Sequence, residues 1–212
     1  MLADFQVAET ASVFTYSRKT TIPYSTVAET IPMLEHRSNL LNAGRITKQE
    51  STTFDKFFNA MARYFDQQPC PEGISAQNLL GVAKHNETTQ DHLSLPEKTS
   101  AGWFKHRQPL ETQAKNLCAL FYLMDAAISF VPLTHSHLTL SDVGACSSLD
   151  FALRIFSNDV SLNKWHLQEM QTVTGGNGRT YAESRLYDEA GNMVASMTQQ
   201  SIMRPLPVKA SL

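Results

Sequence analysis

Residues 179–204 read RTYAESRLYDEAGNMVASMTQQSIMR, and this stretch decides the fold. Residues 179–187 and 193–204 each have the length and composition of a β-strand, and alternate residues from Met193 to Met197 are apolar. The five residues between the two runs, 188–192, include the glycine that is typical of a hairpin connection of this length. The stretch therefore predicts two antiparallel strands.

Two further strands are predicted upstream, at residues 165–173 and 147–156. The second of these runs alternates, with apolar residues at 149, 151, 153 and 155 between the residues at 148, 150, 152 and 154. This alternation predicts that Ser148 and Asp150 share the polar face of their strand. Together the four strands predict an antiparallel meander.

A long helix is predicted before the meander, from Pro109 to about Phe130. Proline fits the first turn of a helix, and Pro132 is expected to end this one. Its apolar block, residues 117–133, is shorter than the roughly 20 residues that cross a bilayer, so we expect no membrane span. A helix that is apolar nearly all round must be wrapped by other structure. Residues 100–205 thus predict one α+β domain.

The N-terminal half has weaker patterns. Residues 2–8 alternate as a strand does, but no partner strand precedes them. Residues 9–99 are interpreted as a long linker with one amphipathic helix near 54–66, whose Phe and Met side chains are expected to serve packing. Residues 206–212 form a tail.

Composition excludes several classes of protein. The 212 residues include 18 Lys and Arg against 20 Asp and Glu, and no basic cluster predicts a nucleic-acid partner. The three cysteines Cys70, Cys118 and Cys146 lack CxxC spacing, which argues against a disulfide framework or a cysteine-rich zinc site. The N-terminus has no signal or transit pattern, so we expect a cytoplasmic protein.

Five segments in register carry a resemblance to a known family. They are CSSLD at 146–150, WHL at 165–167, GGNGR at 175–179, LYDEAGNMVAS at 186–196 and QQSIMR at 199–204. In order and spacing they resemble the second half of the type II acyl-CoA thioesterases, in particular a fungal-like branch. This family has two tandem hotdog domains, each a long helix wrapped by an antiparallel sheet. The resemblance implies a hotdog fold for residues 100–205, with residues 1–8 as the last strand of a first hotdog that is mostly missing.

The resemblance also implies a catalytic site at Asp125, Ser148 and Gln199. In the family these positions hold a water molecule that attacks the thioester carbonyl, which releases a free acid and CoA without a metal or redox cofactor. From the residues alone, Asp125 also fits an acid that turns toward water, and Ser148 fits a surface hydroxyl. His135 and His137 are interpreted as part of a solvated loop rather than as metal ligands, and Gly175–Gly178 as a bulge or turn between strands.

Two other functions remain open at this stage. One is non-hydrolytic binding of acyl-CoA, and the other is a different hotdog reaction on an acyl thioester, such as dehydration in a biosynthetic pathway. Unpaired sheet edges predict a homodimer or a higher homo-oligomer. The C-terminal Ser211–Leu212 resembles a degraded peroxisomal signal, an alternative to the cytoplasm.

Overall fold

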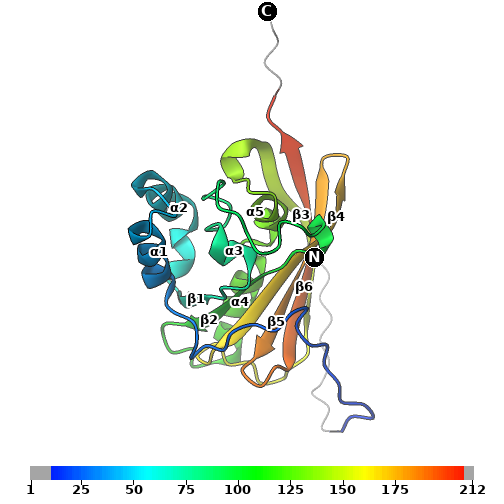
Figure 1. The fold of residues 1–212 in the computed structure, drawn as a ribbon. Helices are drawn as coiled ribbons and strands as arrows, with labels where there is room; N and C mark the ends of the chain where they lie inside the picture. The colour runs from blue at the N-terminus through cyan, green and yellow to red at the C-terminus, as the bar shows by residue number, and fades with distance from the viewer. Residues whose placement is uncertain (1–10, 208–212) are drawn as a thin grey trace, which may run out of the picture.

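The computed structural model describes residues 11–207; the strand expected at residues 2–8 and the Ser211–Leu212 signal lie outside them. One six-stranded antiparallel sheet forms the centre of the molecule, with the strand order β1-β2-β4-β5-β6-β3 (Figure 1). The strands are β1 (Phe65–Pro69), β2 (Ser100–His106), β3 (Val143–Ile155), β4 (His166–Gly176), β5 (Arg179–Asp188) and β6 (Met193–Pro205). The strands predicted from residue 147 onward are all present.

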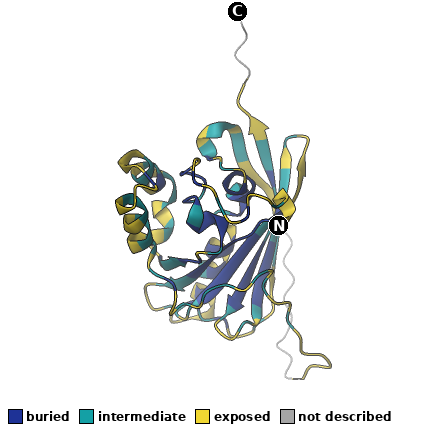
Figure 2. Cartoon of the chain, viewed as in Figure 1, coloured by how far each residue is buried: buried dark blue, intermediate teal, exposed yellow. Residues whose placement is uncertain are grey.

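Helices cover one face of this sheet. They are α1 (Met33–Asn42), α2 (Lys48–Ala62), α3 (Ile74–Gln77), α4 (Gln113–Asp125) and α5 (Val131–His135), with short 3-10 turns η1 (Leu95–Glu97), η2 (Ile128–Phe130) and η3 (Leu140–Asp142). Leu120 and Leu123 of α4 are fully buried against Leu186 of β5 and Met197 of β6. Figure 2 shows that buried residues gather in the middle strands, whereas α1 and α2 carry many exposed residues. A long helix packed on an antiparallel sheet confirms the predicted hotdog architecture.

The connection between β4 and β5 is a two-residue turn, Asn177–Gly178. Both residues have positive φ, 52° and 73°, which is the backbone of a type I′ turn. Of the glycine-rich segment at 175–178, for which a bulge or a turn was predicted, Asn177 and Gly178 form the hairpin turn and Gly175 and Gly176 end β4.

The helix predicted over 109–130 is wrong at both ends. It begins after Thr112, whose hydroxyl accepts a hydrogen bond from the Lys115 backbone N–H, and it ends at Asp125. Ala127 then turns the chain with a φ of 71°. Pro132 lies in the first turn of α5 and so begins a helix instead of ending one, because the first turn does not need the missing N–H.

One side of α4 is also open, contrary to the expectation that the helix is wrapped all round. Phe121 and Tyr122 are each 38% exposed. By length and composition alone, Gln113–His135 is apolar enough to cross a membrane, but half of its most apolar window is buried inside this fold. The turn at Ala127 also interrupts the helix, so the fold uses the segment as the core of the domain.

The segment expected as a linker differs from that expectation. Its helix, α2, starts at a capping box formed by Thr47 and Glu50 and ends at Ala62. Phe65 belongs instead to β1, the edge strand that pairs with β2. The residue itself is only 3% exposed. The sequence pattern predicts that the helix includes Phe65, because the spacing of aromatic residues alone does not distinguish the end of a helix from the start of a buried strand.

Residues 17–25, which we call the strap, run across the face of the sheet opposite α4 (Figure 1). The Thr21 backbone N–H and the Tyr24 hydroxyl donate to the Glu169 carboxylate, at 2.8 and 3.1 Å. Glu169 also pairs with Arg185 at 3.0 Å, and both side chains are at most 5% exposed. The strap thus supplies hydrogen-bond donors to the Glu169 carboxylate, a member of a buried ion pair that needs more partners than the sheet alone provides.

Candidate functional site

Asp125 and Gln199 are directly bonded. The Gln199 side-chain amide donates from Nε2 to Asp125 Oδ1 at 2.6 Å, and Gln199 is fully buried on β6. Asp125 is the last residue of α4 and remains exposed on its other side. A carboxylate at the C-terminus of a helix is disfavoured by the helix dipole by about 0.3–1 kcal/mol, and the amide donor offsets this cost.

Ser148 lies on the same face of the sheet as Gln199, and the predicted placement beside Asp150 is wrong. Ser148 pairs with Ser201, whereas Asp150 pairs with Gln200, so the register shifts by one residue at Leu149. This β-bulge interrupts the alternation, and side chains of cross-strand partners share a face. The bulge therefore turns Ser148 toward the helix-covered face and leaves Asp150 on the other face with Gln200.

Ser129 connects these groups, and the sequence analysis missed it. Its hydroxyl is 2.5 Å from Gln199 Oε1, 3.2 Å from Ser148 Oγ and 3.1 Å from Ser201 Oγ. Ser129 is the hydroxyl in the apolar run AAISFVP, residues 126–132, so a polar residue in a core segment was the available signal. All three predicted site residues thus belong to one bonded group.

The positive φ of Ala127 brings this group together. A non-glycine residue in the left-handed region costs on the order of 1 kcal/mol and persists only where its surroundings hold it. The turn lies between Asp125 and Ser129, so it determines how the end of α4 faces the hydroxyl of η2.

An apolar cavity of about 440 Å³ opens beside the bonded group. Asp125, Ser129 and Ser148 contribute to its polar side. Its remaining walls come from α1 and α2, from β1, β2 and β4, from the loop after α3 and from residues near the end of α4; the apolar ones include Met33, Phe57, Phe58, Met61, Leu80, Phe104, Phe130 and Met170. The cavity is therefore largely apolar, with the bonded group on one side and a few further polar side chains, Gln67, Gln68, Ser75 and Gln168, elsewhere in its lining.

The aromatic residues of α2 divide between two roles. Phe54 is 5% exposed and packs in a core cluster with Ile46 and Leu79. Phe57 and Phe58 line the cavity, and Phe58 lies 6.3 Å from Phe130 in an edge-on arrangement. The expectation that this helix serves packing alone is incomplete, because one side of it forms a cavity wall.

Cys146 also lines the cavity but is not poised as a nucleophile. Burial raises the pKa of its thiol, so the protonated form is favoured. Its Sγ lies 3.7 Å from the Ser129 carbonyl oxygen. Hydrolysis by an activated cysteine is therefore not supported by this arrangement.

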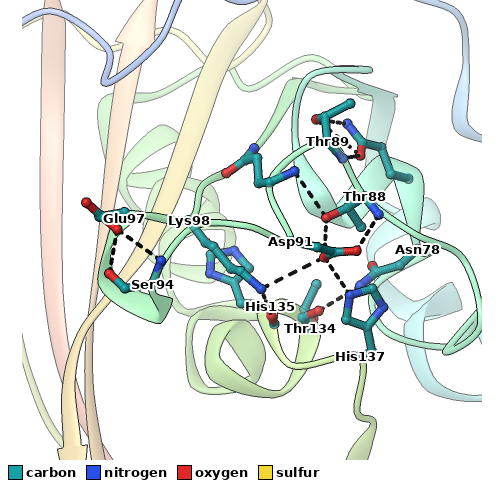
Figure 3. Close-up of polar contacts among 12 residues, drawn as sticks. Asn78, Thr88, Thr89, Asp91, Ser94, Glu97, Lys98, Thr134, His135 and His137 are labelled. Carbon is teal, nitrogen blue, oxygen red and sulfur yellow. Dashed lines mark hydrogen bonds and ion pairs between the residues drawn. The ribbon is translucent and has the colours of Figure 1, made fainter.

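His135 and His137 lie in a different part of the fold, shown in Figure 3. His137 contacts Asp91 at 2.8 Å, and Lys98 lies between Asp91 and the His135 backbone carbonyl, to which it donates at 3.0 Å. His135 is fully buried, so the expected solvated loop is wrong for this residue. Within residues 11–207, no group of three or more His, Cys, Asp or Glu side chains is placed to hold a metal ion.

The comparisons with known proteins agree with this architecture. Residues 50–203 match the family described as the acyl-CoA thioesterase C-terminal domain. No curated protein matches the sequence.

Solved structures supply three comparisons. An acyl-CoA thioesterase II, TesB2, from Mycobacterium marinum is 22% identical, with 68% of this chain and 50% of that chain covered and a TM-score of 0.49. A TesB protein of Mycobacterium avium subspecies paratuberculosis is 12% identical, with 69% of this chain and 49% of that chain covered and a TM-score of 0.52. A hotdog protein of unknown function from Alicyclobacillus acidocaldarius is 10% identical, with 93% of this chain and 59% of that chain covered and a TM-score of 0.57.

The last two comparisons support the hotdog fold. This chain spans about half the length of the two mycobacterial proteins.

Proposed function

Because this chain belongs to the family of acyl-CoA thioesterase C-terminal domains, we propose that it hydrolyses an acyl-CoA to the free acid and CoA. The observation that carries the proposal is the direct bond between Gln199 and Asp125, a carboxylate that lines a largely apolar cavity. A thioester needs both parts of this arrangement. Its carbonyl carbon must meet an activated water molecule, and its acyl chain must leave bulk water.

Water is the nucleophile in the proposed reaction. Asp125 accepts a proton from water as the water oxygen bonds to the thioester carbon. The tetrahedral intermediate then expels the sulfur of CoA, which takes up a proton and leaves as the thiol. Gln199 holds the Asp125 carboxylate through its Nε2 hydrogen bond, and Ser148 positions the water. The reaction needs no metal or redox cofactor, and CoA enters as part of the substrate.

The cavity is the proposed site of the acyl chain. Its apolar walls favour transfer of methylene groups from water by about 0.8 kcal/mol for each CH₂ that is buried. Each additional pair of buried methylenes therefore strengthens binding about 15-fold until the cavity is full. The walls contributed by α1 and α2 set the length at which this gain stops.

We also propose that a second copy of the chain covers the open edge of the sheet. The edge strand β3 exposes Leu149 and Phe151, at 49% and 41%. Phe151 packs edge-on against Phe121 of α4 at 5.1 Å, so the apolar surface extends from the strand to the helix. An unpaired apolar edge of this kind favours pairing between identical subunits.

The test is release of free thiol from acyl-CoA substrates of increasing chain length by the purified full chain. Asp125→Asn is expected to lower kcat by about 100-fold or more, because a general base typically contributes that much. Ser148→Ala is expected to lose part of the activity and Ser148→Thr to retain it. Asp159→Asn, a change at an exposed carboxylate away from the cavity, is the matched control.

Three outcomes would contradict the proposal. Binding of acyl-CoA without thiol release would favour a non-hydrolytic binding protein. Conversion of a hydroxyacyl-CoA to an unsaturated acyl-CoA would favour a dehydratase. An Asp125→Asn variant with the parental rate would remove this carboxylate from the mechanism.

A further inference from the structure

Ser129 lies where the side chains of the proposed site meet. Its hydroxyl contacts Gln199 Oε1, Ser148 Oγ and Ser201 Oγ, and the residue is 9% exposed. We propose that Ser129 is a positioning residue. It determines which group donates and which accepts in each hydrogen bond of this network, and it thereby makes Ser148 a hydrogen-bond acceptor toward the cavity. This inference rests on the proposed function.

The direction follows from the number of hydrogens available. An ionised carboxylate only accepts hydrogen bonds, so the amide of Gln199 must present Nε2 to Asp125, at 2.6 Å. Its Oε1 atom then faces Ser129, at 2.5 Å, and can only accept. The one hydroxyl hydrogen of Ser129 is therefore donated to Gln199.

The number of hydrogens on the Ser129 hydroxyl also determines the role of Ser148. A serine hydroxyl donates one hydrogen bond and accepts up to two. With its hydrogen committed to Gln199, Ser129 can only accept from Ser148, at 3.2 Å, and from Ser201, at 3.1 Å. Ser201 also lies 3.3 Å from Gln199 Oε1, and whichever of these two acceptors takes its hydrogen, Ser129 keeps a lone pair for Ser148. Ser148 thus gives its hydrogen to Ser129 and presents lone pairs to the cavity that it lines.

This direction has a chemical consequence for the water molecule. Asp125 and Ser148 both line the cavity and both offer acceptors there. A water molecule that donates one hydrogen to each has its oxygen lone pair free for the carbonyl carbon. If Ser148 instead donated its hydrogen into the cavity, it would compete for that lone pair. Ser129 prevents this because it keeps the Ser148 hydrogen.

The test uses variants of Ser129 in the full chain. Ser129→Ala removes the hydroxyl that donates to Gln199 Oε1 and that accepts from Ser148, and kcat is expected to fall about 10- to 100-fold while KM changes less than about twofold. Ser129→Thr keeps a hydroxyl and is expected to restore most of kcat. Ser157→Ala, a serine outside the site, is the matched control and should retain the parental kcat and KM.

A double variant separates positioning from general damage. If Ser129 acts through Ser148, then Ser129→Ala has a smaller effect on kcat in a Ser148→Ala background than in the parent. Parental kcat in Ser129→Ala would overturn the inference. So would full additivity of the two changes or the absence of rescue by threonine in a folded variant.

A second measurement does not depend on turnover. The Gln199 side-chain amide gives ¹⁵N–¹H resonances that can be assigned by comparison with Gln199→Ala. We expect slow hydrogen exchange of this amide in the parent and in Ser129→Thr, and faster exchange in Ser129→Ala, because Oε1 then loses its closest hydrogen-bond partner. Equal exchange in all three proteins would overturn the inference. A parent without thioesterase activity would contradict the proposed function, while this exchange pattern would still decide the role of Ser129.

Discussion

Mild acid is predicted to destabilise this protein through His135. Burial, and then the nearby charge of Lys98, lower the pKa of His135 to about 3. The imidazole is fully buried, and its Nε2 lies 3.0 Å from the Ser100 hydroxyl. Folding therefore keeps this histidine neutral at pH values where the unfolded chain protonates it.

The sign and size follow from proton linkage. The pKa is about 6.5 in the unfolded chain and lower in the folded protein, so the unfolded state binds more protons between these values. The stabilisation is complete above about pH 6.5 and declines as the pH falls toward 3. Between pH 7 and pH 5 this residue alone lowers the free energy of unfolding by about 2 kcal/mol.

Urea unfolding at pH 7, 6 and 5 measures this loss. Burial also lowers the pKa of His166, so the parent alone does not isolate the contribution of His135. The comparison is therefore with His135→Gln, which keeps a hydrogen-bonding group near Ser100 and cannot titrate. His135→Gln should lose about 2 kcal/mol less than the parent over this pH range, whereas His92→Gln, at an exposed position, should behave as the parent does.

Parallel pH dependence in the parent and in His135→Gln would refute the reasoning. If His135→Gln does not fold, NMR titration of the imidazole in the parent replaces the comparison. A His135 ring that protonates near pH 6.5 in the folded protein would then refute it.

Three further predictions concern stability and assembly. Thr47→Ala removes the N-cap of α2 and should lower the free energy of unfolding by about 1 kcal/mol in urea unfolding, with a Thr20→Ala variant as the control. Gly81→Ala should lower it by about 3 kcal/mol, because φ is 84° and a Cβ atom would lie 2.1 Å from the Leu138 carbonyl oxygen; an unchanged unfolding midpoint would contradict this geometry. Phe151→Glu places a charge on the open sheet edge and should convert a dimer into a monomer in light scattering, whereas a parent that is already monomeric would argue against the proposed assembly.

The sequence predicted the centre of the sheet well because its signal there is local. The strands from residue 165 onward have clear lengths and turn residues, and β5 and β6 lie within a residue of their predicted limits. The Asn177–Gly178 turn was equally readable, because few residue pairs accept two positive φ values. These features depend on neighbours in the chain, which a sequence displays directly.

The errors arise where distant contacts decide the structure. The bulge at Leu149 reverses the face of Ser148, but only the register with β6 reveals it. The strap is polar and aperiodic, and it docks because Glu169 and Arg185, far along the chain, need hydrogen-bond partners. The turn at Ala127 similarly depends on its surroundings, since alanine has no preference for a positive φ.

The candidate site shows how these local and distant effects combine. Its three predicted residues came from a family resemblance, yet each by itself fits an ordinary structural role. Asp125 ends a helix, Ser148 lies on an edge strand and Gln199 is in a buried strand. What distinguishes them is that a bulge and a turn, both irregular, bring them into one bonded group, of which Asp125 and Ser148 line the cavity. Because regular strand and helix geometry would separate them, the bulge at Leu149 and the turn at Ala127 are the features on which the proposed chemistry depends.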